Sequence, residues 1–211
     1  AKSKRERIEE AVNNLKANKA IDAAAHEAAT SPNNDTPQPT PAQQEAGNYK
    51  KGHIAVHGLN ISVENPAGSS REGVDQTGKA WKNTMTDHYG YIKGTVGNDK
   101  DHIDTYVGKS VDSDNVFIVN QVNPKTGAFD EHKVMLGYAN QAEAESAYNS
   151  NYAADWKGKG SVTPMTVAEF KTWLKDGDHT QPASATAPAK APEREKSLAQ
   201  KYAESVGSGE W

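Results

Sequence analysis

The chain has 211 residues, of which 35% are hydrophobic, and it carries a formal net charge of -4 and no cysteine. The lack of cysteine excludes disulfides, thiolate zinc sites and cysteine nucleophiles, and the negative charge gives no reason to expect nucleic-acid binding by the whole chain. No apolar run is long enough to span a membrane, and the basic first residues are not followed by the apolar stretch of a secretory signal.

The two ends of the chain differ in composition from its middle. A thin apolar stripe that begins at Ile8 predicts a helical segment over residues 1–30. Residues 31–45 are rich in Pro, Asn, Thr and Gln, which predicts a linker that no helix crosses. Residues 177–211 predict an Ala/Pro-rich tail with a short helix at SLAQKYAES. We expect both ends to be mobile or to dock on a larger assembly.

Residues 46–176 predict one folded domain. Runs of β-branched and aromatic residues predict strands over residues 53–64 (two strands and a turn), 89–96, 102–107, 115–122 and 131–138. After these strands the apolar spacing becomes helical, and Asn140 and Thr166 are each followed three residues later by Glu, as at a helix N-terminus. Strands followed by helices predict an α+β fold, with a small mixed or antiparallel sheet or barrel flanked by C-terminal helices.

An acidic loop lies between two of the predicted strands. It contains Asp99, Asp101 and Asp104, and three crowded carboxylates repel one another unless a cation neutralises them. Oxygen ligands without Cys or a His cluster favour Mg²⁺ or Mn²⁺ over zinc. From the spacing alone, a solvated Asp-rich turn is the favoured interpretation, because Asp and Asn are common in turns. An EF-hand loop is excluded, because Ile103 would occupy its fifth position and its Gly and closing Glu are missing.

The sequence around this loop resembles the signature of soluble inorganic pyrophosphatases. Residues 88–104 read HYGYIKGTVGNDKDHID, which is similar to a YGYI strand followed by an Asp-x-Asp-Pro-x-Asp metal loop, with His102 in place of Pro. A closer resemblance is to the pyrophosphatase-like domain of phage and prophage polyvalent proteins. It covers about residues 41–174 and is carried by AGNYKKGHI, ISVENPAGSSR, HYGYIKGTVG, DEHKVMLGY and WKGKGSVTPM.

This resemblance implies a fold, an activity and a setting. The fold would be an OB-like, barrel-like sheet of the pyrophosphatase type. The activity would be Mg²⁺-dependent hydrolysis of pyrophosphate or a related phosphoanhydride by a metal-activated water. The expected partner is a small phosphate-containing substrate, with no membrane or nucleic acid. The setting would be the cytoplasm of a bacterial host or a virion, within a larger phage polyprotein or a homo-oligomer.

The resemblance also assigns metal binding and catalysis to particular residues. The metal ligands would be Asp99, Asp101, Asp104 and Glu131, with Asp130 as an alternative to Glu131. Asp101 would in addition accept the proton of the attacking water. Glu64, in VENP, resembles the acidic residue of the family's Glu-x-Pro segment.

Phosphate binding is assigned to tyrosines and basic residues. These are Tyr89, Lys133, Tyr152, Arg71, Lys82 and Lys157. Together with Asp101, Tyr89 and Lys133 would be the catalytic residues. The family places Tyr-Lys on its C-terminal helix, but Ala153 follows Tyr152 here, so Lys157 or Lys159 would have to reach the same phosphate.

Two departures keep a second function open. Ala153 replaces a phosphate-binding lysine, and NPKTG fills the position of the family's other hairpin aspartate. These favour a non-catalytic phosphate- or metal-binding module of a phage-encoded polyvalent or virion-associated protein. The aspartate trio and Lys133 favour the enzyme.

Other histidines and tryptophans have simpler interpretations. His53 and His57 lie in a β-branched run, where residues four apart do not meet, so we expect exposed or packing side chains. His132 should point away from the face of its strand that bears Lys133. The tryptophans at 81, 156 and 173 are interpreted as core or lid residues and not as a stacking surface.

Overall fold

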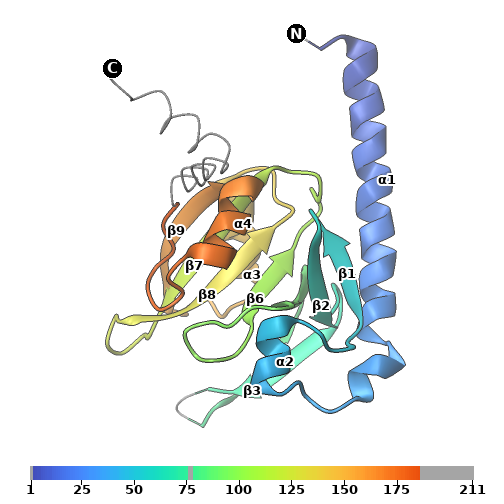
Figure 1. Cartoon of the computed structure of the whole chain (residues 1–211). Coiled ribbons are helices and arrows are strands. Elements are labelled where there is room, and N and C mark those ends of the chain that lie inside the picture. The colour runs from blue at the N-terminus through green and yellow to red at the C-terminus, as the bar shows by residue number, and fades with distance from the viewer. Residues whose placement is uncertain (1, 76–77, 186–211) are drawn as a thin grey trace, which may run out of the picture.

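The computed structural model describes residues 2–75 and 78–185, which form a central sheet with helices on its faces and along one side (Figure 1). The N-terminal elements are α1 (Lys4–Ala29), the 3-10 helix η1 (Pro32–Asp35) and α2 (Pro41–Ala46). The remaining elements are β1 (His53–Val56), β2 (Leu59–Asn65), β3 (Ser70–Val74), β4 (Ala80–Thr84), β5 (His88–Ile92), β6 (Ile103–Val107), β7 (Asn115–Val122), β8 (Phe129–Leu136), α3 (Gln141–Ser150), β9 (Lys159–Thr166) and α4 (Val167–Asp176).

The main sheet is mixed and has seven strands in the order β1-β2-β5-β6-β8-β7-β9, while β3 and β4 pair separately. All pairs in the main sheet are antiparallel except β6 with β8, which are parallel. The predicted α+β class is confirmed. Within the described residues no pairing joins β1 to β9, so the predicted closure into an OB-like barrel is not confirmed.

The two faces of the sheet build two cores, because successive side chains of a strand point to opposite sides. On β7, Val116 and Ile118 belong to the core under α1 and α4, which also contains Phe170 and Trp173. Phe117 belongs to the other core, which is rich in tyrosine and is covered by α3. The candidate site lies on this tyrosine-rich side.

Both predicted helix starts in the C-terminal part are confirmed. The side chain of Asn140 accepts a hydrogen bond from the backbone N–H of Glu143 at the start of α3, and Thr166 forms a capping box with Glu169 at the start of α4. Strand β9 was not predicted, because Gly160 and Pro164 interrupt its sequence. Proline is tolerated there because β9 is an edge strand that pairs only with β7.

The described ends of the chain are more ordered than the sequence predicts. The C-terminal half of α1 packs against β1 and β2, where Ala25 is fully buried, and the predicted linker contains η1 and α2. Beyond α4, His179 contacts Trp173 and Ala183 is buried. The predicted helix at SLAQKYAES lies outside the described residues. No described helix is long and apolar enough to cross a membrane. The division into the segments 1–30, 31–45, 46–176 and 177–211 stays a prediction.

Candidate active site

Lys133 is the centre of a polar cluster built by three neighbouring strands. It lies on β8 and is only 5% exposed. Its ammonium group donates to Asp104 Oδ2 at 2.5 Å, to Glu131 Oε2 at 2.9 Å and to the hydroxyl of Tyr89 at 3.2 Å. The hydroxyl of Tyr89, on β5, donates to Asp104 in turn. The parallel pairing of β6 with β8 sets Asp104 opposite Lys133, so the backbone register fixes this contact.

The β3–β4 hairpin brings a second cation to the cluster. Arg71 Nη2 donates to the hydroxyl of Tyr89 at 3.2 Å, and its guanidinium lies 4.2 Å from the centre of the Tyr89 ring. Lys82 pairs with Glu72 on the opposite face of the hairpin and is exposed. The structure therefore brings Arg71 to the cluster and leaves Lys82 outside it.

The acidic loop is held by hydrogen bonds from its own backbone. Asp99 Oδ1 accepts from the N–H of Asp101 at 3.0 Å, and Asp101 Oδ1 accepts from the N–H of His102 at 2.7 Å. The Asp101 side chain is 78% exposed. His102, which replaces the family's proline, stacks on Tyr91 with ring centres 4.0 Å apart and lies 2.6 Å from the hydroxyl of Tyr49. Packing of this buried imidazole anchors the loop to the sheet.

The electrostatics of the cluster reflect crowded carboxylates around a buried cation. Burial raises the pKa of Glu131, and the charges of Asp104 and Asp99 add to this shift, while Lys133 opposes it. Desolvation of its carboxylate raises the pKa of Glu64, and the negative charge of Asp104 adds to this shift. Burial disfavours the charge on Lys133, but neighbours that include Tyr89 and Asp104 outweigh it and raise the pKa of Lys133 well above its ordinary value.

The donor set near Lys133 fits a hard divalent cation. It consists of carboxylate oxygens only, on Asp99, Asp101, Asp104, Glu131 and Glu64. Such donors suit Mg²⁺ or Mn²⁺, and burial, with an added contribution from the charge of Asp104, raises the pKa values of Glu64 and Glu131. Within residues 2–75 and 78–185, however, no three of these carboxylates bring oxygens within 4.8 Å of one another. In this structure Asp104 and Glu131 are neutralised by Lys133 instead.

Other residues predicted from the sequence lie at or beyond the edge of the cluster. Tyr152 reaches it, since its hydroxyl lies 3.5 Å from that of Tyr106 and accepts from Gln121 Nε2 at 2.9 Å. Lys157 is exposed, and Lys159 pairs with Glu145, so neither is brought to Lys133. Because side chains alternate along β8, exposed Asp130 lies on the opposite face from Glu131.

His132 points away from the cluster, as predicted. Its Nε2–H donates to the carbonyl of Gln181 at 2.9 Å, and its ring contacts Trp173 edge to face.

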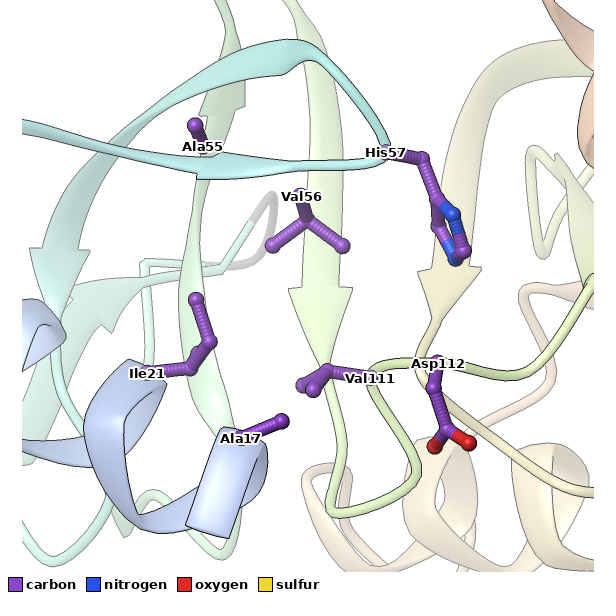
Figure 2. Close-up of a pocket in the computed structure, with 7 residues that line it drawn as sticks. All are labelled: Ala17, Ile21, Ala55, Val56, His57, Val111 and Asp112. Carbon is purple, nitrogen blue, oxygen red and sulfur yellow. The ribbon is translucent and has the colours of Figure 1, made fainter. Parts of the chain in front are cut away.

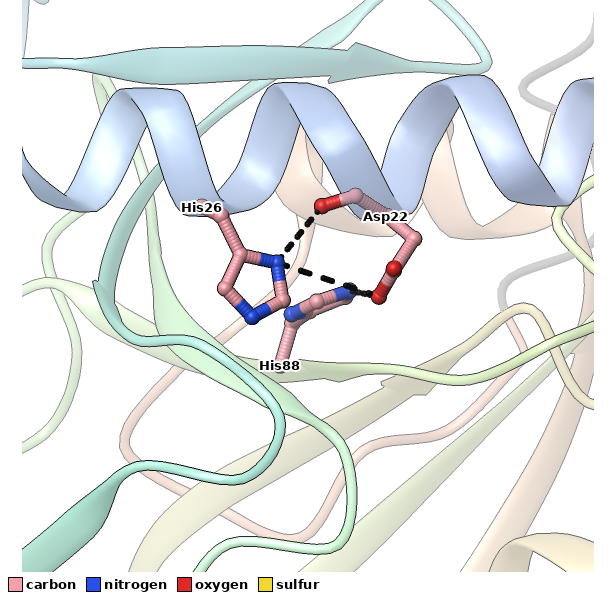
Figure 3. Close-up of side chains that lie close together, drawn as sticks. All are labelled: Asp22, His26 and His88. Atoms are coloured by element: carbon pink, nitrogen blue, oxygen red, sulfur yellow. Dashed lines mark hydrogen bonds and ion pairs between the residues drawn. The ribbon is translucent and has the colours of Figure 1, made fainter.

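A cluster of Asp22, His26 and His88 was not predicted, because α1 and β5 are far apart in the sequence (Figure 3). His88 Nε2 lies 3.0 Å from Asp22 Oδ1, and His88 Nδ1 accepts from the N–H of Ala67 at 2.9 Å. The distances would suit a metal ion, but a proton on His88 Nε2 would have to leave because Nδ1 already faces a donor. The contact is better described as a hydrogen bond from neutral His88 to Asp22 that fastens α1 to β5.

Two cavities differ in their position relative to the cluster. One of about 390 Å³ lies between α1, β1 and the loop after β6, with His57 and Asp112 at one end (Figure 2). It contains none of the predicted site residues. A second cavity of about 230 Å³ is lined by Glu64, Tyr91 and Lys51, among others, and adjoins the cluster through Glu64.

The mixed sheet presents a buried lysine, an arginine, a tyrosine and several carboxylates together, and this set of side chains is suited to binding phosphate groups. The sequence profile of the inorganic pyrophosphatase family matches residues 41–175, which is more than half of the chain. The chain therefore belongs to the inorganic pyrophosphatase family. Searches of curated proteins and of solved structures each found no match.

Proposed function

We propose that this protein hydrolyses inorganic pyrophosphate, or a related phosphoanhydride, in a reaction that requires Mg²⁺. The observation that carries the proposal is the convergence of Lys133, Arg71 and Tyr89 with Asp104 and Glu131. This convergence lies within the part of the chain that matches the family. Paired cations beside clustered carboxylates suit a substrate that is a polyanion bound together with a metal.

The carboxylates would hold the metal. Asp99, Asp101, Asp104 and Glu131 supply the oxygen donors that Mg²⁺ prefers, and Mn²⁺ suits the same set. Bound there, the ion supplies a water whose pKa is lowered enough to provide hydroxide near neutral pH. Asp101 is the proposed proton acceptor because its carboxylate lies on the acidic loop and is exposed to solvent.

The cationic residues would hold the phosphates. Lys133 and Arg71 place positive charge where negative charge accumulates on the leaving phosphate. Burial raises the pKa of Tyr89 well above its ordinary value, so its hydroxyl stays protonated and can donate to a phosphate oxygen. Tyr152 would add a second hydroxyl from the tyrosine-rich side. Because Asp104 and Glu131 already contact Lys133, the substrate has to compete with them for its ammonium group.

The test is phosphate release from pyrophosphate by the unmodified chain at increasing Mg²⁺, followed by addition of a chelator. We expect release that rises with Mg²⁺ and stops on chelation, whereas a phosphomonoester, which lacks the anhydride, is not hydrolysed. Absence of release from the folded chain at any Mg²⁺ or Mn²⁺ concentration would refute this activity.

A second candidate is a non-catalytic module that binds phosphate or metal. It is favoured by Ala153, which stands where the family has a phosphate-binding lysine, and by the positions of Lys157 and Lys159 away from the cluster. Calorimetric binding of phosphate and Mg²⁺ without any turnover would support this candidate.

We also propose a phage or prophage origin, in a polyvalent protein that acts in the cytoplasm of the bacterial host or is carried in the virion. The motif resemblance supports this origin. The first half of α1 extends beyond the domain, and its exposed apolar residues Ile8 and Leu15 would be available for docking on a larger assembly. Detection of this chain within a longer phage-encoded product in infected cells would test the setting, and its absence from such cells would refute it.

A further inference from the structure

Two tryptophans beside the proposed phosphate site remain partly exposed. Trp81 and Trp156 are each 38% exposed. The other large apolar side chains that are exposed in the described part of the chain lie on the first half of α1 or at Val74. Exposed apolar surface beside a polar site commonly marks a binding surface. Neither residue is a buried core residue, whereas Trp173 is buried as expected, and a lid position for Trp81 and Trp156 stays a prediction.

Trp81 lies next to the arginine of the cluster. It stands opposite Gly73 in the β3–β4 pair, and a Cβ atom at Gly73 would lie only 2.7 Å from the indole, so the ring packs directly on that backbone. The guanidinium of Arg71 lies 5.5 Å from the centre of the indole and 4.2 Å from the centre of the Tyr89 ring. Arg71 thus links Trp81 to the cluster around Lys133.

Trp156 is the last residue in a series of aromatic contacts that begins at the cluster. Its indole is nearly parallel to Tyr152, with centres 5.2 Å apart, and its Nε1–H donates to the hydroxyl of Tyr148 at 2.9 Å. Tyr152 in turn reaches Tyr106, which packs on Tyr89 with ring centres 4.8 Å apart. Stacking on Tyr152 and the hydrogen bond to Tyr148 hold the indole in place.

A hydrogen bond joins the two elements that carry the tryptophans. Asn83, two residues after Trp81 and on the same face of β4, donates through Nδ2 to the carbonyl of Asn151 at 2.9 Å. Asn151 ends α3, immediately before the Tyr152–Trp156 loop. The hairpin and this loop therefore border the same side of the cluster.

Pyrophosphate does not account for these indoles. It is small and fully charged, and it offers no flat apolar surface to an aromatic ring. A nucleobase does, and base stacking on exposed tryptophan is favourable for every base. We infer that the substrate is a nucleoside polyphosphate, with phosphates at Lys133 and Arg71 and a base stacked on the surface formed by Trp81 and Trp156. The inference rests on the proposed function for the position of the phosphates.

The reaction would be the same addition of water to a phosphoanhydride. The water oxygen bonds to one phosphorus atom, and the bond from that phosphorus to the bridging oxygen breaks. The bridging oxygen leaves with the other phosphate, and the proton of the water passes to Asp101. No oxidant, reductant or further reactant is needed.

The test compares binding and turnover in variants of the full chain. Dissociation constants for a nucleoside triphosphate with a non-hydrolysable methylene bridge are measured by calorimetry with Mg²⁺. The variants are Trp81→Ala and Trp156→Ala, with Val74→Ala as an exposed apolar control on the same hairpin. We expect each tryptophan variant to weaken nucleotide binding by about 5- to 100-fold and to raise KM for pyrophosphate by a smaller factor, because the indoles pack against Arg71 and Tyr152, while Val74→Ala changes neither.

The outcomes separate this inference from the proposed function. If pyrophosphate is hydrolysed but the nucleotide binds no better than methylene diphosphonate, the inference is wrong and the proposed function stands. If nucleotide binding depends on the tryptophans but no anhydride is hydrolysed, the binding surface stands and the hydrolase proposal fails. Equal nucleotide affinity in all three variants and the unmodified chain would overturn the inference.

Discussion

Asp104 and Lys133 face each other across the parallel strands β6 and β8, with the Lys133 ammonium 2.5 Å from Asp104 Oδ2. This pair is the only parallel connection among the described strand pairs, and it unites the end of the acidic loop with the hairpin strand that carries Glu131. The buried cation neutralises carboxylates that would otherwise repel one another. The same contact brings a phosphate-binding cation next to the proposed metal ligands.

Replacing Lys133 by Met should affect both stability and activity. The substitution leaves Asp104 and Glu131 partly buried without their counter-ion, which costs about 3–5 kcal/mol of unfolding free energy. We expect pyrophosphate hydrolysis to fall at least about 100-fold. Urea unfolding and phosphate release measure the two effects. The double variant Lys133→Met/Asp104→Asn should regain stability but no activity, and a double variant that regains turnover would contradict the assignment.

The two adjacent acidic residues of β8 should differ in function. Glu131 contacts Lys133 at 2.9 Å, whereas Asp130 lies on the outer face of the strand. Glu131→Gln should therefore raise the Mg²⁺ concentration required for half-maximal activity by about tenfold. Asp130→Asn should leave it unchanged, as measured by activity titrations with Mg²⁺. Equal shifts in the two variants would contradict the placement of Glu131.

Gly90, in the Tyr-Gly-Tyr motif, should not tolerate a side chain. A Cβ atom there would lie 1.8 Å from the carbonyl oxygen of Ser62 on the neighbouring strand β2. Gly90→Ala has to separate β5 from β2 and should destabilise the fold by about 3 kcal/mol or more. Gly127→Ala is a suitable comparison, since the space around Gly127 is open and only its positive φ costs about 1 kcal/mol. Chemical denaturation compares the two, and equal losses would refute the steric argument.

His132 should make stability depend on pH. Burial lowers its pKa to about 4, so between pH 6.5 and about 4 the unfolded chain binds a proton that the folded chain does not. The contribution of His132 to the free energy of unfolding is complete above pH 6.5 and is lost as the pH falls. The loss is on the order of 2 kcal/mol between pH 7 and pH 5. Urea unfolding of His132→Gln, which keeps a donor for Gln181, should show a smaller loss over this interval. An identical pH dependence in both proteins would contradict the assignment.

Local signals in the sequence predicted the regular elements well. β7 coincides with the predicted run over residues 115–122, and the caps at Asn140 and Thr166 form as expected, because both depend on neighbouring residues. The strands β3 and β4 were missed because they are short, polar and largely exposed, which leaves no apolar period.

Contacts between distant segments could not be predicted in the same way. The approach of Lys133 to Asp104 followed from resemblance to a family and not from spacing, since it depends on a parallel pairing between strands. The packing of α1 rests on small residues such as Ala25, which give only a weak helical stripe. Its contact between Asp22 and His88 carries no local signal at all.

The most direct test of the proposed site is the rate of Mg²⁺-dependent phosphate release from pyrophosphate by Asp101→Asn, beside the unmodified chain and Asp112→Asn. Asp101 and Asp112 are both exposed loop residues, but only Asp101 belongs to the acidic loop, so neither substitution should alter unfolding by more than about 0.5 kcal/mol. We predict that Asp101→Asn loses release by at least about 100-fold, while Asp112→Asn retains the rate of the unmodified chain. Equal rates in all three proteins would contradict the placement of the reaction at the acidic loop.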